Sequence, residues 1–125
     1  TSAQYAGLQM LKSAFEDNFS AVEEMREEYN VRRRFLVDRL NKMGLTCFEP
    51  RGAFYVFPCV RSTGMDGEQF AERLIESKKV AVVPGGAFGE SGKDFVRISY
   101  AYSLSDLKKA MDRIEEFVNE LSQSK

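Results

Sequence analysis

Helical periodicity dominates the first third of the chain. Residues 3–15 mix Ala, Leu, Met and Phe in a helical pattern that breaks at the polar residues 16–18, which predicts a short helix. A capping box, in which the Ser20 oxygen faces the amide of the third helical residue and Glu23 reaches back, predicts the start of a long helix. We expect this helix to stop at Gly44, because glycine readily adopts the left-handed conformation. Its apolar stripe consists of Val22, Met25, Tyr29, Leu36, Leu40 and Met43.

Three shorter apolar runs predict strands. They cover residues 53–60, 80–83 and about 95–101. In the third run, successive side chains alternate between two faces. One face carries Val96, Ile98 and Tyr100, and the other carries Phe95, Arg97 and Ser99. Arg97 therefore places a charge in the middle of an apolar strand.

Two further helices are predicted from their start signals. Asp66 caps the first, with Gln69 reaching back, and this helix should end near Ser77. Ser103 caps the second, whose apolar stripe follows a 3.6-residue period and is therefore expected to be core. The stripe consists of Leu104, Leu107, Met111, Ile114, Phe117, Val118 and Leu121. Few strands and long helices predict the α+β class, with a small mixed β-sheet packed by helices.

Length and composition narrow the function classes. The chain has 125 residues, enough for one domain, with 43% hydrophobic and 30% charged residues and a net charge of −1. No apolar run approaches the ~20 residues of a membrane span, and no basic arm favours nucleic acid. The chain starts at Thr1, without a methionine and within a helical pattern, so we expect it to be part of a longer protein.

The cysteines and histidines limit metal and thiol chemistry. Cys47 and Cys59 are the only cysteines, and there is no histidine, so we expect neither a metal site nor a Cys-His catalytic pair. Both cysteines lie near apolar, strand-like segments, which favours small buried thiols over a disulfide. Free thiols are consistent with a cytoplasmic protein.

Arg97 is the strongest candidate for binding chemistry. Its planar fork of donors suits two-point capture of a carboxylate or phosphate, although a structural ion pair with an acidic residue is the alternative. The loop 84–94 before it holds four glycines but does not match a phosphate-binding Walker A loop, since Ala87 replaces the first glycine and Asp94 follows Lys93. Turn chemistry, with Pro84 fixing φ and the glycines supplying positive φ, accounts for most of this composition.

Two motifs carry a resemblance to a known family. The first is Pro84-Gly85-Gly86-Ala87-Phe88-Gly89, followed by Gly92 and then Arg97-Ile98-Ser99-Tyr100-Ala101; the second is Pro50-Arg51-Gly52-Ala53-Phe54-Tyr55, after Asn41-Lys42-Met43-Gly44-Leu45. In order and spacing, nearly the whole chain resembles the end of the fold-type I pyridoxal-phosphate aminotransferases of the aspartate and aromatic group. The resemblance implies that residues 21–125 form the small C-terminal domain, and that residues 1–20 are the tail of the large domain and the bridge between the two.

The resemblance also implies roles for individual residues. Arg97 would bind the substrate α-carboxylate, and the glycine loop would shape the substrate entrance. Phe54 would line the same pocket, or would be a plain core aromatic. No lysine of this chain lies in the family's Schiff-base context, so the lysine and most contacts to pyridoxal 5'-phosphate are implied to lie on an upstream large domain. The chain alone is therefore expected to be inactive, and no catalytic or cofactor-binding residue is assigned in it.

Two functions stay open at this point. One is part of a homodimeric aminotransferase that moves an amino group between an amino acid and a 2-oxo acid. The other is a non-catalytic module that binds a small acid or another protein, with Arg97 in a structural ion pair. For part of such an aminotransferase, we expect an exposed apolar surface that the large domain and a partner subunit would cover. The first helix should contribute most of it, through Tyr5, Leu8, Met10, Leu11 and Phe15.

Overall fold

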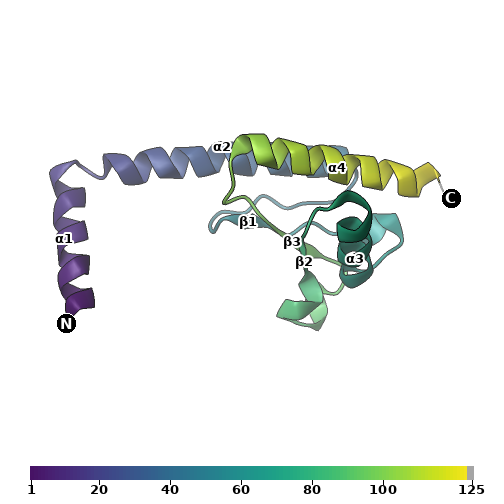
Figure 1. Ribbon diagram of the computed structural model, residues 1–125, viewed down its shortest axis with the longest axis horizontal. Helices are drawn as coiled ribbons and strands as arrows, with labels where there is room; N and C mark the ends of the chain where they lie inside the picture. Colours follow the sequence, from purple (N-terminus) through teal and green to yellow (C-terminus); the bar gives the residue numbers. More distant parts are fainter. Residues whose placement is uncertain (124–125) are drawn as a thin grey trace. The chain divides into compact units, whose positions relative to one another are not determined.

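The computed structural model describes residues 1–123. Its main elements are four helices and three short strands (Figure 1). The helices are α1 (Ser2–Glu16), α2 (Ser20–Lys42), α3 (Gly67–Lys78) and α4 (Leu104–Gln123), and the strands are β1 (Tyr55–Val56), β2 (Val83–Pro84) and β3 (Val96–Ser99). The chain divides into two compact units, Thr1–Val31 and Arg32–Lys125.

The first unit confirms the short helix and corrects the start of the long one. The Ser20 hydroxyl donates to Asp17 (3.4 Å) rather than facing an amide of its own helix. Asn18 and Phe19 have positive φ (56° and 59°), so Ser20 is already helical and the Glu23 amide donates to the Phe19 carbonyl (3.0 Å). The expected capping box is wrong for this reason. The apolar side chains of α1 are exposed, as expected: Tyr5, Leu8, Met10, Leu11 and Phe15.

The predicted end of α2 is confirmed. Gly44 has φ +83°, and its amide donates to the Asn41 carbonyl (3.1 Å). The Leu45 amide then donates to the Leu40 carbonyl (3.0 Å), which closes the last turn. Leu40 and Leu45 are both fully buried, so the helix end is fixed in the core of the second unit.

The sheet has the order β1-β3-β2, and both pairings are antiparallel. The α+β class is confirmed, but the sheet is antiparallel and not mixed, because β1 and β2 both run opposite to β3. All three strands are shorter than expected, since β1 covers residues 55–56, β2 covers 83–84 and β3 covers 96–99. Ala53 has φ +62°, which takes residues 53–54 out of the start of β1. Pro84 lies one residue beyond the predicted end of the second run and ends β2, because it has no N–H to donate.

Helices cover one face of this sheet and form the core with it. Phe70 of α3 and Phe117 of α4 meet edge to face, with ring centroids 5.4 Å apart. The predicted stripe of α4 is confirmed in its middle, because Leu107, Met111, Ile114, Phe117 and Val118 are buried, whereas Leu104 and Leu121 near its ends are half-buried. Val96, Ile98 and Tyr100 are buried, as the alternation along the third run predicted, and Val56 of β1 is buried as well.

Capping contacts fix the starts of α3 and α4 as predicted. The Gln69 amide donates to the Asp66 carboxylate (2.9 Å), and the Asp66 amide donates to the Gln69 side chain (3.3 Å). At the start of α4, the Asp106 amide donates to the Ser103 hydroxyl (3.1 Å). These bonds satisfy amides that have no partner within the helix.

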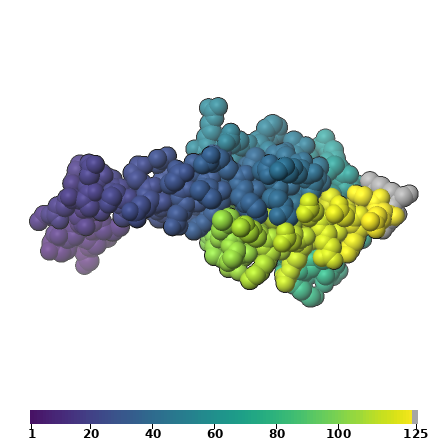
Figure 2. Space-filling view, turned by 90° about the horizontal axis from the view of Figure 1, so that it is seen from above, coloured from purple at the N-terminus to yellow at the C-terminus, as the bar shows by residue number. Residues whose placement is uncertain are grey.

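Ion pairs join α4 to its neighbouring helices. Arg39 of α2 contacts Asp112 (2.8 Å) and Glu115 (2.9 Å). In Figure 2, α4 (green to yellow) lies beside the blue part of α2 that belongs to the second unit. The helices thus form one layer behind the sheet, which leaves the other face of β3 for the candidate site.

Both cysteines are free thiols, as expected, with Cys47 buried and Cys59 half-buried. Burial raises the pKa of Cys47 to about 11.

Within residues 1–123, no helix is long and apolar enough to cross a membrane. No group of three or more Cys, Asp or Glu side chains in this part of the chain could hold a metal ion.

Candidate substrate-carboxylate site

Arg97 lies in the middle of β3, on the face opposite to the core. Its neighbours in sequence, Val96 and Ile98, are buried, whereas Arg97 is half-buried. The register pairs Arg97 with Val83 of β2, and Ser99 with Tyr55 of β1. Because paired residues in an antiparallel sheet point to the same side, Tyr55 and Arg97 share this outer face.

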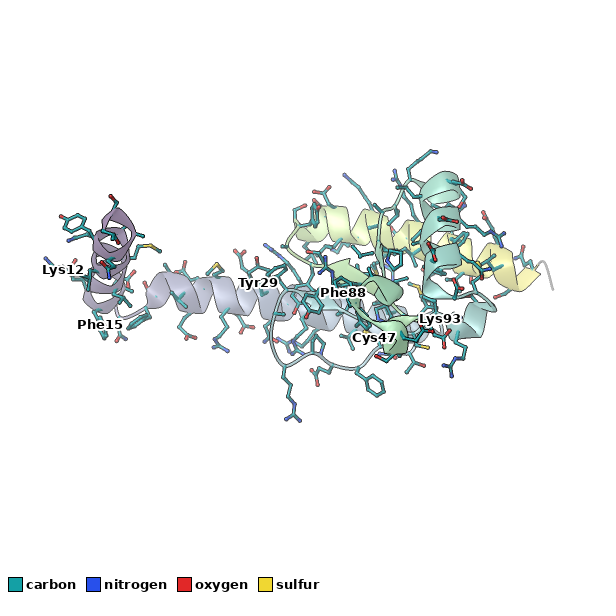
Figure 3. The ribbon with its side chains drawn as sticks, turned by 90° about the horizontal axis from the view of Figure 1, so that it is seen from below. Lys12, Phe15, Tyr29, Cys47, Phe88 and Lys93 are labelled. Carbon is teal, nitrogen blue, oxygen red and sulfur yellow. The ribbon has the colours of Figure 1, made fainter. Side chains whose placement is uncertain are left out.

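Two aromatic rings contact the Arg97 guanidinium. Its Cζ lies 4.7 Å from the ring centroid of Phe88 and 5.5 Å from that of Tyr55. Both distances are within the range of a cation–π interaction. The Phe88 side chain, labelled in Figure 3, is 55% exposed, and Tyr55 is 38% exposed. The two rings therefore contact the Arg97 guanidinium without enclosing it.

No carboxylate neutralises Arg97 within the described part of the chain. Its side chain forms no ion pair and no hydrogen bond with residues 1–123. The structural ion pair that we kept as an alternative is therefore not formed inside this chain. A half-buried guanidinium with five unpaired donors is suited to bind an external anion.

The glycine loop places Phe88 over the sheet. Phe88 ends the 3-10 turn Gly85–Phe88, and the Gly85 amide donates to the Phe95 carbonyl (2.8 Å). Only Gly89 of this loop has positive φ (+130°), which corrects our expectation that the glycines serve mainly that purpose. Gly85 and Gly92 are required for close approach instead, since a Cβ on either would lie 2.3 Å from the carbonyl oxygen of the other.

Phe54 lies beside this cluster. Its ring meets Tyr55 edge to face, with centroids 6.3 Å apart, and it is 54% exposed. The interpretation of Phe54 as a core aromatic is therefore wrong. The Tyr100 amide donates to the Phe54 carbonyl (2.8 Å), and the Tyr100 hydroxyl donates to the Ala53 carbonyl (3.0 Å). Tyr55 contacts both predicted residues, Phe54 and Arg97, which have no ring contact with each other.

Tyr55 and Phe88 were not predicted as neighbours of Arg97. Tyr55 could have been found from the alternation of β1, because Val56 is a core residue and Tyr55 must then face outward. No local signal predicts the position of Phe88, which depends on how the glycine loop folds back.

A groove borders the site. Arg97 and Ser99 line a space of about 480 Å³ between residues 79–83 and α4, a volume typical of small-molecule sites. Lys109 and Arg113 of α4 also line it, so cations outnumber the single acid, Asp106.

The described lysines do not fit a Schiff base with pyridoxal phosphate. They are Lys12, Lys42, Lys78, Lys79, Lys93, Lys108 and Lys109, whereas Lys125 lies outside the described residues. All but Lys78 are exposed, including Lys12 and Lys93, labelled in Figure 3. Hydrogen bonds to Glu120 (2.6 Å) and Glu116 raise the pKa of Lys78. A Schiff-base lysine needs the opposite shift, so we assign none of these lysines as the Schiff-base residue.

Comparison with known proteins identifies the family. The family model "Aminotransferase class I and II" matches residues 1–114. The chain is 48% identical over 120 residues to an aspartate aminotransferase of Pyrococcus abyssi, covering 96% of this chain and 30% of that protein. It is also 48% identical over 117 residues to the putative aminotransferase YugH of Bacillus subtilis, covering 94% of this chain and 29% of that protein. The chain thus spans about 30% of the length of these relatives.

Comparison with solved structures gives the same family. An aromatic aminotransferase from Pyrococcus horikoshii superposes with a TM-score of 0.81 at 48% identity, over 84% of this chain and 28% of that one. An aspartate aminotransferase from Thermus thermophilus, solved with maleate, gives a TM-score of 0.82 at 40% identity, over 91% of this chain and 29% of that one. The sequence motifs, the α+β fold and these similarities agree, and the chain belongs to the class I and II aminotransferase family.

Proposed function

We propose that this chain is part of an aminotransferase that moves an amino group between an amino acid and a 2-oxo acid, and that Arg97 binds the substrate α-carboxylate. The observation that carries the proposal is the Arg97 guanidinium on the outer face of β3, contacted by two rings and by no carboxylate of the described chain. The family supports the reaction class, and the maleate with which the Thermus thermophilus relative was solved is itself a carboxylate.

Two-point binding explains what Arg97 contributes. The guanidinium fork donates to both oxygens of a carboxylate at once, which fixes the orientation of the attached α-carbon. Such positioning contributes several kcal/mol to a reaction by holding reactants in a productive geometry. Phe54, exposed beside Tyr55, lines the same pocket in this proposal. A non-catalytic module with a structural ion pair at Arg97 lacks support, because no such pair forms within residues 1–123.

The remaining parts of the active site lie outside this chain in our proposal. Residues 21–125 form the small C-terminal domain, and residues 1–20 are the tail of the large domain and the bridge. Pyridoxal 5'-phosphate is held mainly by the large domain, which supplies the Schiff-base lysine that the described lysines do not provide. This chain by itself is then inactive.

The proposed assembly and location follow from surface properties. The exposed apolar side chains of α1 support a homodimer, in which a large domain and a partner subunit cover such surfaces. Two free cysteines support the cytoplasm as its location. A net charge of −1 gives little electrostatic drive toward nucleic acid.

Substitution of Arg97 in the full-length protein tests the proposal. Arg97→Lys keeps the charge but loses the planar fork, and a charge-assisted hydrogen bond is worth about 1.5 to 3 kcal/mol. We expect kcat/KM for an α-amino acid to fall about ten- to a hundredfold, and further for Arg97→Ala. An amine without an α-carboxylate is the control and should be nearly unaffected. Unchanged kcat/KM for Arg97→Ala, or an unfolded protein, would assign Arg97 a different role.

A further inference from the structure

We propose that Phe88 is a positioning residue for Arg97, and that its ring holds the guanidinium in the orientation that receives a carboxylate. This inference rests on the proposed function of Arg97. Phe88 acts through Arg97 and not on the substrate, so its removal should change carboxylate recognition more than any other property of the protein.

Arg97 needs such support because nothing else in the described chain orients it. An arginine side chain is flexible, and ordering it costs up to about 2 kcal/mol of rotamer entropy. Within residues 1–123 no hydrogen bond or ion pair of the side chain provides that order. The contacts that remain are the rings of Phe88 at 4.7 Å and Tyr55 at 5.5 Å. The orientation of the free guanidinium is therefore set by aromatic faces.

Phe88 is itself held in place by a chain of aromatic contacts. It meets Phe57 edge to face, with centroids 6.2 Å apart, and Phe57 stacks on Phe95 at 5.5 Å with an interplanar angle of 13°. Phe95 directly precedes β3, the strand that carries Arg97. These contacts thus connect the Phe88 ring to β3, the strand that carries Arg97.

The backbone of the loop restricts Phe88 further. The Gly85 amide is bonded to the Phe95 carbonyl (2.8 Å), and Gly85 and Gly92 touch across the base of the loop. Phe88 remains 55% exposed, so its ring is held at the surface of the second unit, in contact with the Arg97 guanidinium.

Phe88 is a cleaner test position than Tyr55. Tyr55 is part of the β1–β3 ladder, so its substitution also disturbs the sheet. Phe88 lies in a loop, and its truncation leaves the buried core of the second unit intact. Phe48 provides the matched control, because it is 78% exposed and has no ring or cation contact in the described chain.

The test compares Phe88→Leu, Phe88→Tyr and Phe48→Leu with the parent in the full-length protein. A cation–π contact is worth from about twofold to tenfold or more in affinity. We therefore expect Phe88→Leu to raise KM for an α-amino acid, and the Kd for maleate measured by calorimetry, about two- to tenfold, with a smaller change in kcat. Phe88→Tyr should restore both values, because the ring face is kept. Phe48→Leu, and an amine without an α-carboxylate as substrate, should show no such change.

The outcomes separate this inference from the proposed function. If Arg97→Lys weakens carboxylate binding and a folded Phe88→Leu does not, the positioning role is overturned and the role of Arg97 stands. If neither substitution has an effect, both proposals fail. If Phe88→Leu unfolds the protein, Phe88→Met keeps an apolar side chain of similar volume without a ring, and unchanged binding in that variant would equally overturn the inference.

Discussion

Gly85 and Gly92 face each other across the base of the loop that carries Phe88, with no room for a side chain between them. A Cβ on Gly92 would lie 2.3 Å from the Gly85 carbonyl oxygen, and a Cβ on Gly85 would lie 2.3 Å from the Gly92 carbonyl oxygen. The atoms in the way belong to the backbone, so a substitution must move the chain. The glycine content of this loop is thus explained by packing as well as by turn geometry.

Gly92→Ala should therefore destabilise the second unit. Because overpacking typically costs about 1 to 3 kcal/mol, we expect a decrease of that size in the free energy of unfolding, measured with urea. Gly86→Ala is the matched control in the same loop, since a Cβ there meets nothing within 4 Å. Equal stability of the two variants would contradict the close approach described here.

The sequence predicted most reliably what depends on local signals. The stripe of α4, the Asp66 to Gln69 capping box and the stop at Gly44 were all confirmed, because each depends on residues within a few positions of one another. The strand predicted over 53–60 was too long. Its start is lost because the left-handed Ala53 is held by a hydrogen bond from the Tyr100 hydroxyl to its carbonyl, which no neighbouring residue reveals.

The sequence predicted only the part of the candidate site that depends on local signals. Alternation along β3 correctly placed Val96 and Ile98 in the core and Arg97 on the outer face. The rings that contact Arg97 come from β1 and from the glycine loop, and the strand register and the fold of the loop decide their positions. Pairwise contacts of this kind require the three-dimensional structure.

The two thiols should differ in reactivity. Burial raises the pKa of Cys47 to about 11, so little thiolate forms there near pH 8. We expect iodoacetamide to modify the half-buried Cys59 first in the native protein, with Cys47 reacting at a comparable rate only in denaturant. Mass spectrometry of peptides after a time course measures both rates. Faster native modification of Cys47 would show that its side chain is not buried.

Asp106 should make part of the stability depend on pH. The Ser103 hydroxyl donates to its carboxylate (2.7 Å) and lowers the pKa of Asp106, with a smaller contribution from Lys109. Because this pKa is lower in the folded than in the unfolded chain, the ionised carboxylate stabilises the folded state. This stabilisation is fully present above the unfolded pKa of about 4 and is lost as the pH falls through the folded pKa.

Asp106→Asn should therefore flatten the decline of the free energy of unfolding below about pH 4, while lowering stability at neutral pH. The exposed Glu72 has no hydrogen bond or ion pair within the described residues, so Glu72→Gln is the control and should keep the parent pH profile. Parallel profiles for Asp106→Asn and the parent would contradict a lowered pKa.

The 125-residue chain should form no stable imine with pyridoxal phosphate. A lysine that forms one at neutral pH needs a neutral amine, usually through burial or a neighbouring cation. Lys78 has the opposite environment, between Glu116 and Glu120, and the other described lysines are exposed. We therefore expect only weak, nonspecific reaction at several lysines, recorded in the visible spectrum and mapped by mass spectrometry after borohydride reduction. A stoichiometric adduct at one defined lysine would show that this chain does supply the Schiff-base residue, and that the large domain is not required for it.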